Sequence, residues 1–409
     1  MAKYKILVIP SDKCGCGKFR SLDPHLCLQE MYGDLFDIDF KYHDELWEQK
    51  DVFPQFLSQY DLIHIHKQVD DMGMFIQICK YLGKKVIVDV DDHYDLGNSH
   101  PMSLTARLER WGDRVIRHIL YADYVTTTQN EFKKTLLKHN KNVFVLPNAI
   151  NPDEKQFEPK NVESDKLRVG IICGSSHLED IKLLNGMISQ FSQEELDKLQ
   201  FVLCGFDIKG SVTRYRENGE KYVDPIKPME TCWYKYENIL TNNYAIVSKE
   251  YKDFLHTFTP NAEYPNWQNE AYRRCWTKHI SEYATHYNNI DVLLVPLVNN
   301  PFNLAKSNLK VIEAGFFHKA IIASNVGPYK EDLVSAVDKG TVNYDANALL
   351  VDETKNNKNW SKYIKLLLND KKLLESLQEN LYNTVKDKYN LKAITEKRKD
   401  FYLKILQEN

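Results

Sequence analysis

The sequence predicts an α/β protein of two Rossmann-like domains, each a parallel β-sheet covered by helices. Short apolar runs alternate with amphipathic stretches in both halves of the chain, which is typical of parallel strands joined by helical crossovers. The length of 409 residues exceeds that of an ordinary single domain. A turn-rich segment at 146–153, followed by a charged segment at 154–166, indicates a linker between the two domains.

The first domain is predicted to span residues 1–150. Its apolar runs give candidate strands at Lys5–Pro10, Asp37–Phe40, Leu62–His66, Lys85–Val90, Tyr124–Thr126 and Val143–Val145. Amphipathic stretches between them predict helices at Met72–Leu82, Thr105–Tyr121 and Gln129–Lys138. Ligands of such a doubly wound unit are expected at the carboxyl ends of its strands.

The second domain is predicted to span residues 151–387. Its candidate strands are Leu167–Cys173, Phe201–Cys204, Asp291–Val295 and Ala320–Ser324, and the Tyr- and Trp-rich section 207–289 is expected to be an irregular elaboration. Residues 359–407 have a sequence pattern that predicts helices, with Trp360, Ile364, Leu367 and Leu368 on one face. The last helix, about 388–409, is a candidate to pack back on the first domain, and a cleft is expected between the domains.

Composition excludes several classes of protein. A net charge of −3 and a pI of about 6.5 argue against a generally basic nucleic-acid binder. The eight cysteines are scattered, and Cys14-Gly-Cys16 lacks zinc-knuckle spacing, so no metal site and a reducing compartment are expected. No apolar run is long enough for a signal peptide or a spanning helix. We therefore expect a cytoplasmic protein, with peripheral membrane attachment left open.

The most informative motif follows the predicted strand Asp291–Val295. A loop leads to a helix expected to begin near Ser307, on which Lys306, Lys310 and Glu313 share one face while Leu309, Ile312 and Phe316 share a buried one. Two lysines at the start of a helix are suited to binding a diphosphate, and Glu313 could accept hydrogen bonds from ribose hydroxyls. The alternative is a solvated Lys/Glu face with an ion pair.

These residues resemble the C-terminal half of glycosyltransferase family 4, together with the strand Ala320–Ser324 and the Asn325–Tyr329 segment that follows it. Further likenesses lie in Leu146–Ile150, which resembles the start of the family's linker, and in the Ala122–Thr128 strand entry. The resemblance implies the GT-B fold and a retaining, metal-independent transfer from a UDP- or GDP-linked sugar, with no separate cofactor. It also implies a Glu-x7-Glu motif, but Ala305 stands where the first Glu belongs, and Lys306 and Lys310 are interpreted as its replacement.

The turn after the strand Leu167–Cys173 is the second donor-binding candidate. Gly174, Ser175, Ser176 and His177 are small or polar, so backbone amides and hydroxyls could approach a phosphate there. The resembling family uses this turn for the donor phosphates. A helix cap by Ser176 with a structural His177 is the alternative.

In the first domain, Gly15, Gly17 and Arg20 follow the first strand. The resemblance implies that this glycine loop lies near the transferred sugar, with Arg20 in reach of a phosphate. The alternative is a plain strand-to-helix turn. At the exit of Lys85–Val90, His93 is the best match to the family's histidine near the reacting centre, with Asp92 orienting it or binding acceptor hydroxyls.

Other interpretations of polar residues stay open. Asp89-x-Asp91 could be the metal-binding D-x-D of single-domain transferases, and His64 with His66 could form either a metal pair or a polar wall. Arg273, Arg274 and the Trp233–Glu237 cluster could contact a base or acceptor, or could hold the irregular section together.

The predicted function is transfer of a sugar from a nucleotide sugar to the hydroxyl of a glycan, a glycolipid or another compound. Extended DNA binding is not expected, although a modified DNA base or a protein side chain as acceptor is a rival hypothesis. A second rival is a nucleotide-sugar binding protein that has lost catalysis with the missing Glu. A dinucleotide-dependent oxidoreductase is disfavoured because no G-x-G-x-x-G is present.

Overall fold

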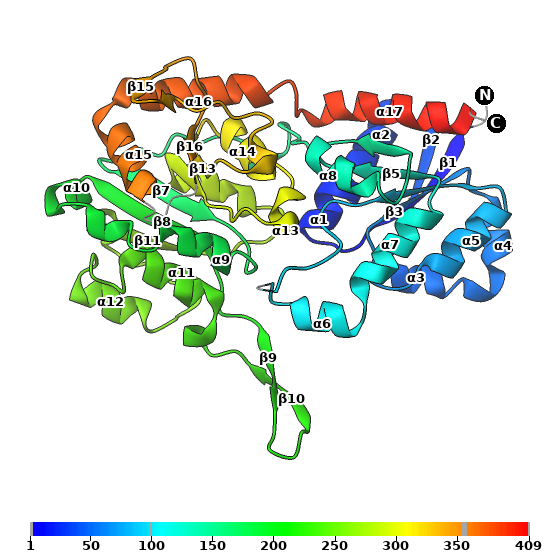
Figure 1. Ribbon diagram of the computed structural model, residues 1–409, viewed down its shortest axis with the longest axis horizontal. Coiled ribbons are helices and arrows are strands. Elements are labelled where there is room, and N and C mark those ends of the chain that lie inside the picture. The colour runs from blue at the N-terminus through cyan, green and yellow to red at the C-terminus, as the bar shows by residue number, and fades with distance from the viewer. Residues whose placement is uncertain (1–2, 99, 353–357, 408–409) are drawn as a thin grey trace. The chain divides into compact units, whose positions relative to one another are not determined.

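The computed structural model describes residues 3–98, 100–352 and 358–407, and the chain divides into two compact units. Unit 1 comprises residues 1–153, 299–312 and 385–409, and unit 2 comprises residues 154–298 and 313–384. Each unit has its own parallel six-stranded sheet (Figure 1). The two sheets are the scaffolds that position the polar residues described below.

Unit 1 is built on a sheet of order β2-β1-β3-β4-β5-β6, all of whose neighbouring strands are parallel. The strands are β1 Tyr4–Ile9, β2 Phe36–Phe40, β3 Leu62–His66, β4 Lys85–Asp89, β5 Tyr124–Thr127 and β6 Val143–Val145. The order reverses beside β1, so a ligand site is expected at the carboxyl ends of the strands near this point.

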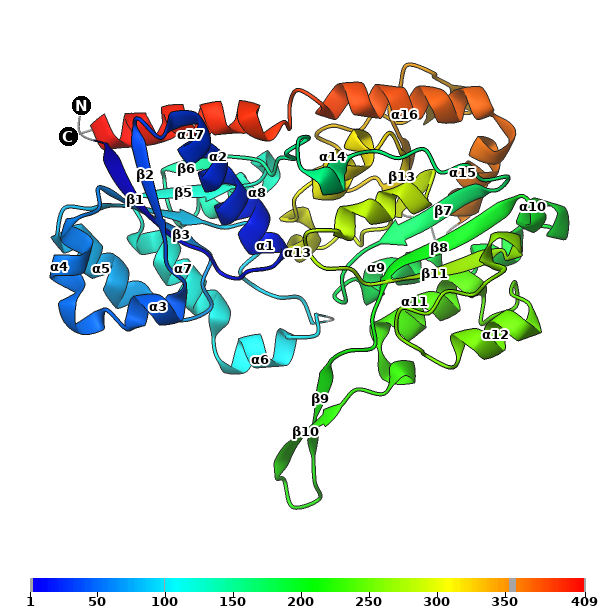
Figure 2. The same ribbon diagram turned by 180° about the vertical axis from the view of Figure 1, so that it is seen from behind.

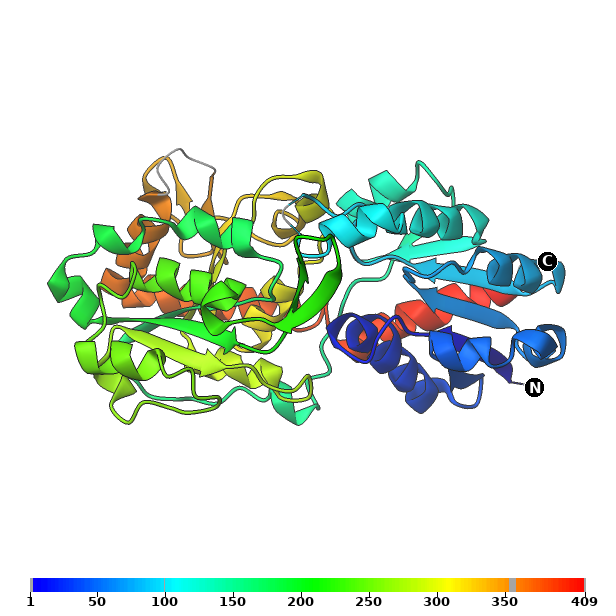
Figure 3. The ribbon, with the colours of Figure 1, turned by 90° about the horizontal axis from the view of Figure 1, so that it is seen from below.

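Helices cover both faces of the unit 1 sheet, because alternate strand residues point to opposite sides. Leu7 and Ile9 face a core shared with α4 Phe53–Ser58, α5 Gly73–Tyr81, α7 Trp111–Tyr121 and α8 Asn130–Leu136. Ile6 and Val8 face α2 Asp23–Tyr32 and α17 Leu391–Gln407. Seen from below, the red helix α17 lies behind the blue strands (Figure 3). Unit 1 also contains the short helices α1 Gly15–Gly17, α3 His43–Trp47 and α6 Ser103–Leu108.

Unit 2 is built on a sheet of order β11-β8-β7-β12-β13-β16. The strands are β7 Leu167–Ile172, β8 Leu199–Phe206, β11 Tyr272–Trp276, β12 Val292–Val295, β13 Ala320–Ser324 and β16 Leu349–Val351. One apolar core joins them to α9 Leu178–Ile181, α10 Gln193–Asp197, α11 Cys232–Thr241, α12 Lys249–Leu255, α15 Lys358–Asn369 and α16 Lys371–Val385. Trp360, Ile364 and Leu367 are buried in this core, and Leu368 packs against it, as their shared face predicts.

The section 207–289 is more regular than its composition suggests. It contains α11, α12 and the edge strand β11, which the sequence interpretation missed because Arg273 and Arg274 interrupt its apolar pattern. It also contains an antiparallel hairpin of β9 Ser211–Tyr215 and β10 Lys221–Pro225, which projects from the rest of unit 2 (Figures 1 and 2). A second, shorter hairpin pairs β14 Val337–Asp338 with β15 Thr341–Val342.

Two predicted helices have different boundaries. The stretch 105–121 is divided into α6 and α7, because Arg110 adopts a left-handed φ of 58° between them. The helix expected from Ser307 begins at Leu309 as α14 Leu309–Phe316, after a separate turn of helix, α13 Pro301–Leu304. Leu309 is only half-buried, whereas Glu313, expected on the exposed face, is 1% exposed.

The segment 299–312 packs with unit 1, although it was assigned to the second predicted domain. Ala305 is part of the unit 1 core, the Gln129 amide donates to the Leu304 carbonyl, and the Asn148 amide donates to the Ser307 hydroxyl at 3.1 Å. Ile150 pairs with Asn390 in a parallel bridge, which leads the chain into α17. Unit 1 is therefore assembled from segments far apart in sequence. Among the described residues, no helix combines the length and apolar character needed to cross a bilayer.

Two neutral histidines lie beneath α17. His25 and His64 are fully buried with ring centroids 4.6 Å apart, and the His25 ring bonds the Ser21 carbonyl and the Tyr402 hydroxyl at 2.6 and 2.8 Å. Burial lowers the pKa of both groups well below the ordinary 6.5, and each histidine is also close to the Arg398 charge. Both imidazoles are therefore neutral in the folded chain.

This burial predicts acid sensitivity. Below pH 6.5 the unfolded chain takes up protons that the folded chain refuses, so stability should fall by about 1.4 kcal/mol per pH unit for each histidine. Urea unfolding at several pH values between 7 and 5 measures the slope. His64→Leu should remove roughly one histidine's share of it, and an unchanged slope in that variant would contradict the assignment.

Candidate functional site

The loop after β1 enters a helix directly. Asp12 Oδ1 accepts hydrogen bonds from the backbone N–H groups of Cys14 and Gly17 at 2.7 and 3.1 Å, and α1 begins at Gly15. A Cβ added to Gly17 would lie 1.9 Å from the Asp12 carbonyl oxygen. Gly17 is thus required for this close approach, and both glycines form a helical first turn rather than an open loop.

Arg20 does not reach toward solvent. Its side chain is 1% exposed and forms a bidentate ion pair with Asp89, with nitrogen–oxygen distances of 2.9 and 2.6 Å. It also donates to the Leu146 carbonyl and the Asn148 side chain. Burial alone would raise the pKa of Asp89, but the Arg20 charge outweighs it and holds that pKa below its usual value. Arg20 is therefore a structural residue here, contrary to the expected phosphate contact.

The same ion pair removes Asp89 from the proposed D-x-D. The Asp89 carboxylate is fully buried and also accepts a hydrogen bond from the Thr126 hydroxyl at 2.6 Å. Among the described residues, the group with ligand atoms close enough to hold a metal is instead Cys16, Asp91 and Asp92, all within 4.8 Å of one another. Lys67 already forms an ion pair with Asp91 at 3.1 Å, and this positive charge competes with a cation.

A chain of polar contacts crosses the carboxyl ends of β1, β3 and β4. The Ser11 hydroxyl bonds His66 Nδ1 at 2.9 Å, and His66 Nε2 lies 3.4 Å from Asp91 Oδ1. His64, two residues before His66, points to the same face of β3, but it is buried beneath α17 against His25 and Tyr402. Among the described residues, the two histidines are not part of a group whose ligand atoms could hold a metal. The sequence offered one signal for this cluster, namely polar residues at the exits of neighbouring strands.

His93 lies in the loop after β4, as expected. Its Nδ1 accepts the Asp95 N–H at 3.0 Å, and its ring lies against the rings of Tyr94 and Phe132. Burial lowers the pKa of His93, so the imidazole is neutral at neutral pH. Asp92 precedes it and is half-buried.

In unit 2, the turn after β7 is fixed on its inner side and open on its outer side. The Tyr236 hydroxyl donates to the Gly174 carbonyl and accepts the His177 N–H, both at 3.1 Å. The His177 ring bonds Asp180 at 2.8 Å, and Asp180 also accepts the Val298 N–H. No atom beyond its chain neighbours lies within 4 Å of a Cβ added to Gly174. No side-chain hydrogen bond caps α9 in this described turn, so the alternative interpretation of Ser176 as a helix cap is not supported.

The residues around α14 are divided between two environments. Lys306 and Lys310 are half-buried, and the Lys306 ammonium lies 4.7 Å from the centre of the Phe302 ring. Ser307 accepts the Asn148 hydrogen bond already described. These groups belong to the segment that packs with unit 1, whereas Glu313 belongs to unit 2.

Glu313 is held by two tyrosines that the sequence interpretation did not single out. The Tyr287 hydroxyl donates to its Oε2 at 2.6 Å, and the Tyr283 hydroxyl donates to its Oε1. Burial and the Glu313 carboxylate raise the pKa of Tyr287, so the phenol stays a hydrogen-bond donor. The spacing of the two tyrosines, four residues apart, was the available signal.

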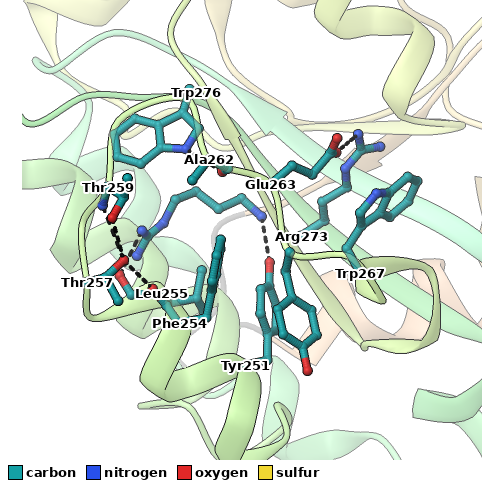
Figure 4. Close-up of a pocket in the computed structure, with 12 residues that line it drawn as sticks. Tyr251, Phe254, Leu255, Thr257, Thr259, Ala262, Glu263, Trp267, Arg273 and Trp276 are labelled. Carbon is teal, nitrogen blue, oxygen red and sulfur yellow. Dashed lines mark hydrogen bonds and ion pairs between the residues drawn. The ribbon is translucent and has the colours of Figure 1, made fainter.

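The aromatic and arginine cluster of the section 207–289 is structural. Arg274 forms a buried bidentate pair with Glu237, at 2.9 and 2.6 Å, and its guanidinium lies 4.0 Å from the centre of the Phe206 ring. Arg273 lies 3.5 Å from the centre of the Trp267 ring (Figure 4). The pocket that they line with Trp276 encloses only about 10 Å³, room for about one water molecule. It cannot take a nucleobase in this conformation.

Comparison with solved structures identifies the fold. The chain is similar over 98% of its length to all of the Anabaena protein Alr3699/HepE in complex with UDP, with a TM-score of 0.59 and 10% identity. It is similar over 100% of its length to all of the catalytic domain of Arabidopsis thaliana starch synthase IV bound to ADP and acarbose, with a TM-score of 0.57 and 13% identity. A putative UDP-N-acetylglucosamine 2-epimerase from Listeria monocytogenes matches over 100% of this chain and 98% of its own, with a TM-score of 0.55 and 10% identity.

No family model matches the chain, and no curated protein matches its sequence. The predicted fold class is nevertheless confirmed, because two α/β units with parallel six-stranded sheets match GT-B glycosyltransferase structures from end to end. At these identities the likeness establishes the fold alone.

Proposed function

We propose that the chain transfers a sugar from a nucleoside diphosphate sugar to a hydroxyl acceptor. The observation that carries the proposal is the turn 173–177 of unit 2, open and anchored at the carboxyl end of a parallel strand, where this class of fold binds ligands. In the reaction, the bond from the sugar C1 to the diphosphate oxygen breaks. A bond from C1 to the acceptor oxygen forms, and the acceptor hydroxyl loses its proton.

The donor phosphates are assigned to this turn. Gly174 leaves space for a phosphate against the backbone, and Ser175 and Ser176 add hydroxyl donors. Tyr236 and Asp180 hold the turn and the His177 ring in place, so little ordering is required on binding. Known structures of the same fold hold UDP, and one holds UDP-glucose, which supports a UDP- or GDP-linked donor.

Glu313 is assigned to the nucleoside together with Tyr283. A carboxylate accepts more than two hydrogen bonds, so Glu313 can keep both tyrosines and accept one from a ribose hydroxyl. Glu313 is buried, so a ribose can reach it only if the half-buried Tyr283 moves aside or shares its hydrogen bond to the carboxylate. Lys306 and Lys310, with Ser307 between them, would neutralise the departing diphosphate without a metal, and the resemblance implies retention of configuration.

His93 and Asp92 are assigned to the acceptor side of the reaction. A neutral imidazole can accept the acceptor proton or orient its hydroxyl, and the Asp95 N–H fixes the ring. Gly15 and Gly17 contribute backbone rather than side chains to the neighbouring turn. The acceptor itself is a glycan, a glycolipid or another hydroxyl compound, with a modified DNA base or a protein side chain as the rival.

Gly174→Val is expected to weaken donor binding without unfolding the chain. The added Cβ meets no neighbour within 4 Å, whereas the new side chain occupies the space assigned to a phosphate. The donor Kd should therefore rise at least about tenfold, a loss of about 1.4 kcal/mol or more. Calorimetric titration with UDP, ADP, GDP and their glucose conjugates measures this.

Gly97→Val is the matched control, since a Cβ there also meets nothing within 4 Å and Gly97 lies in unit 1. It should leave the donor Kd unchanged. Equal affinities for wild type and Gly174→Val would show that the phosphates bind elsewhere. Binding of a donor without turnover for any acceptor would instead favour a nucleotide-sugar binding protein.

A second candidate function is a reaction on the nucleotide sugar itself, favoured by the likeness to the putative epimerase. Proton NMR of the donor without an acceptor separates the two functions. A new nucleotide sugar would indicate isomerisation, and release of free nucleotide only when an acceptor is added would indicate transfer.

A further inference from the structure

Unit 1 contains a cavity that the donor chemistry does not use. It has a volume of about 420 Å³ and lies between the loop after β4 and the start of α7. It is lined by Tyr94, Asp95, Leu96, Ala106, Arg107, Arg110, Gly112, Asp113 and Ile116. This volume falls within the range of small-molecule sites.

The wall of the cavity is fixed by two unusual backbone positions. Arg110 has a left-handed φ of 58°, which allows the chain to turn sharply into α7. A Cβ added to Gly112 would lie 3.1 Å from the Tyr94 carbonyl oxygen, so the first turn of α7 can approach the loop only at a small residue. The cavity is therefore a feature of the folded backbone.

The charges that line the cavity balance. Two arginines and two aspartates lie along its open rim, and all four side chains are exposed. Arg110 forms an ion pair with Asp113 at 2.7 Å, and Arg107 donates to the Ser103 hydroxyl at 3.2 Å. An anionic ligand would gain from the arginines and lose to Asp95 and Asp113, so the lining does not select for a phosphate. The guanidinium and carboxylate groups offer several hydrogen-bond donors and acceptors, and Leu96 and Ile116 are apolar neighbours. Such a lining can form hydrogen bonds with a neutral compound rich in hydroxyl groups.

The cavity lies directly beside His93. Tyr94 and Asp95 line it, the Asp95 N–H donates to His93 Nδ1, and the His93 and Tyr94 rings are 4.5 Å apart. We propose that this cavity binds a neutral sugar unit of the acceptor, with Arg107, Arg110, Asp95 and Asp113 as its hydrogen-bonding groups. The acceptor role rests on the proposed transfer reaction, whereas sugar binding does not.

Arg110→Gly is the sharpest variant for a test, because glycine accepts the left-handed φ and only the side chain is lost. Asp95→Asn is a second variant that keeps the volume of the side chain. Lys339→Gly is the matched control, since Lys339 is an exposed cation with a φ of 47° in unit 2.

Saturation-transfer NMR with methyl glycosides of glucose, galactose, mannose and N-acetylglucosamine gives a readout that needs no donor. We expect at least one glycoside to bind wild type and Lys339→Gly, and to lose at least tenfold in affinity with Arg110→Gly and Asp95→Asn. In a transfer assay, the same two variants should raise the acceptor KM and leave the donor Kd unchanged.

The outcomes separate the two proposals. Absence of glycoside binding to wild type, or binding that survives both variants, would overturn the cavity assignment even if transfer is observed. Glycoside binding that the variants abolish, in a chain that turns over no donor, would support the cavity and reject the transfer reaction.

Discussion

Arg20→Met is expected to lower the free energy of unfolding of unit 1 by about 3–5 kcal/mol, because it leaves a buried carboxylate without its countercharge. Asp89 would keep only the Thr126 hydroxyl, and the hydrogen bonds from Arg20 to Leu146 and Asn148 would be lost as well. Urea unfolding, combined with hydrogen exchange of the β4 and β5 amides, measures the loss and locates it.

Arg117→Met is the control for this substitution. Arg117 pairs with Asp71 at the same 2.6 Å distance as Arg20 with Asp89, but the side chains of Arg117 and Asp71 are both nearly half exposed. An exposed pair contributes less than about 1 kcal/mol, so burial is the variable that the comparison isolates.

The pH dependence of Arg20→Met provides a second check. Without the arginine, burial raises the pKa of Asp89 above its value in the unfolded chain, so the stability difference between wild type and variant should shrink as the pH falls toward protonation of Asp89. Adding Asp89→Asn should recover part of the loss at pH 7. Equal losses for Arg20→Met and Arg117→Met would contradict the view that this buried pair organises the strand ends.

The apolar pattern predicted most of the sheet strands closely. The bounds of β3, β6 and β13 agree to the residue. Short apolar runs mark β6 and β13, and apolar residues that alternate with histidine mark β3. Strand β11 was missed, since Arg273 and Arg274 hide a strand whose polar groups find partners only in the folded unit. Strand β16 was also missed, although it is as short as β6, which was predicted.

The site residues show a different limit. Arg20 follows two glycines and was interpreted as a phosphate contact, but its partner Asp89 lies 69 positions away in the sequence. Helical periodicity placed Glu313 on an exposed face, and the tyrosines that bury it lie 26 and 30 residues earlier. Local patterns predict where a polar group stands on its element. Whether it is paired and buried depends on distant segments, and a single sequence does not reveal those pairings.

Lys310→Met is expected to lower kcat for the transfer reaction by about 10²–10³-fold, the usual cost of losing one group that stabilises developing charge. Lys310 stands one turn before Glu313 on α14, and the chain carries Ala305 where the resembling family has its first glutamate. If the lysines replace that carboxylate by neutralising the leaving diphosphate, their effect should fall mainly on kcat, whereas Glu313→Gln should fall mainly on the donor KM. Lys306→Met should resemble Lys310→Met.

Lys371→Met provides the matched control, because Lys371 is a helical, largely exposed lysine with an ion pair to Glu375. Its kcat and its unfolding midpoint should equal those of wild type. A Lys310→Met enzyme with normal kcat and raised donor KM would assign the lysine to ground-state binding of the nucleotide. Normal values of both kcat and donor KM would show that the lysines near the start of α14 are not part of the site. The unit 2 turn at 173–177 would then bind the diphosphate alone. The kcat-to-KM split therefore decides whether the departure at Ala305 is a change of catalytic strategy or a loss.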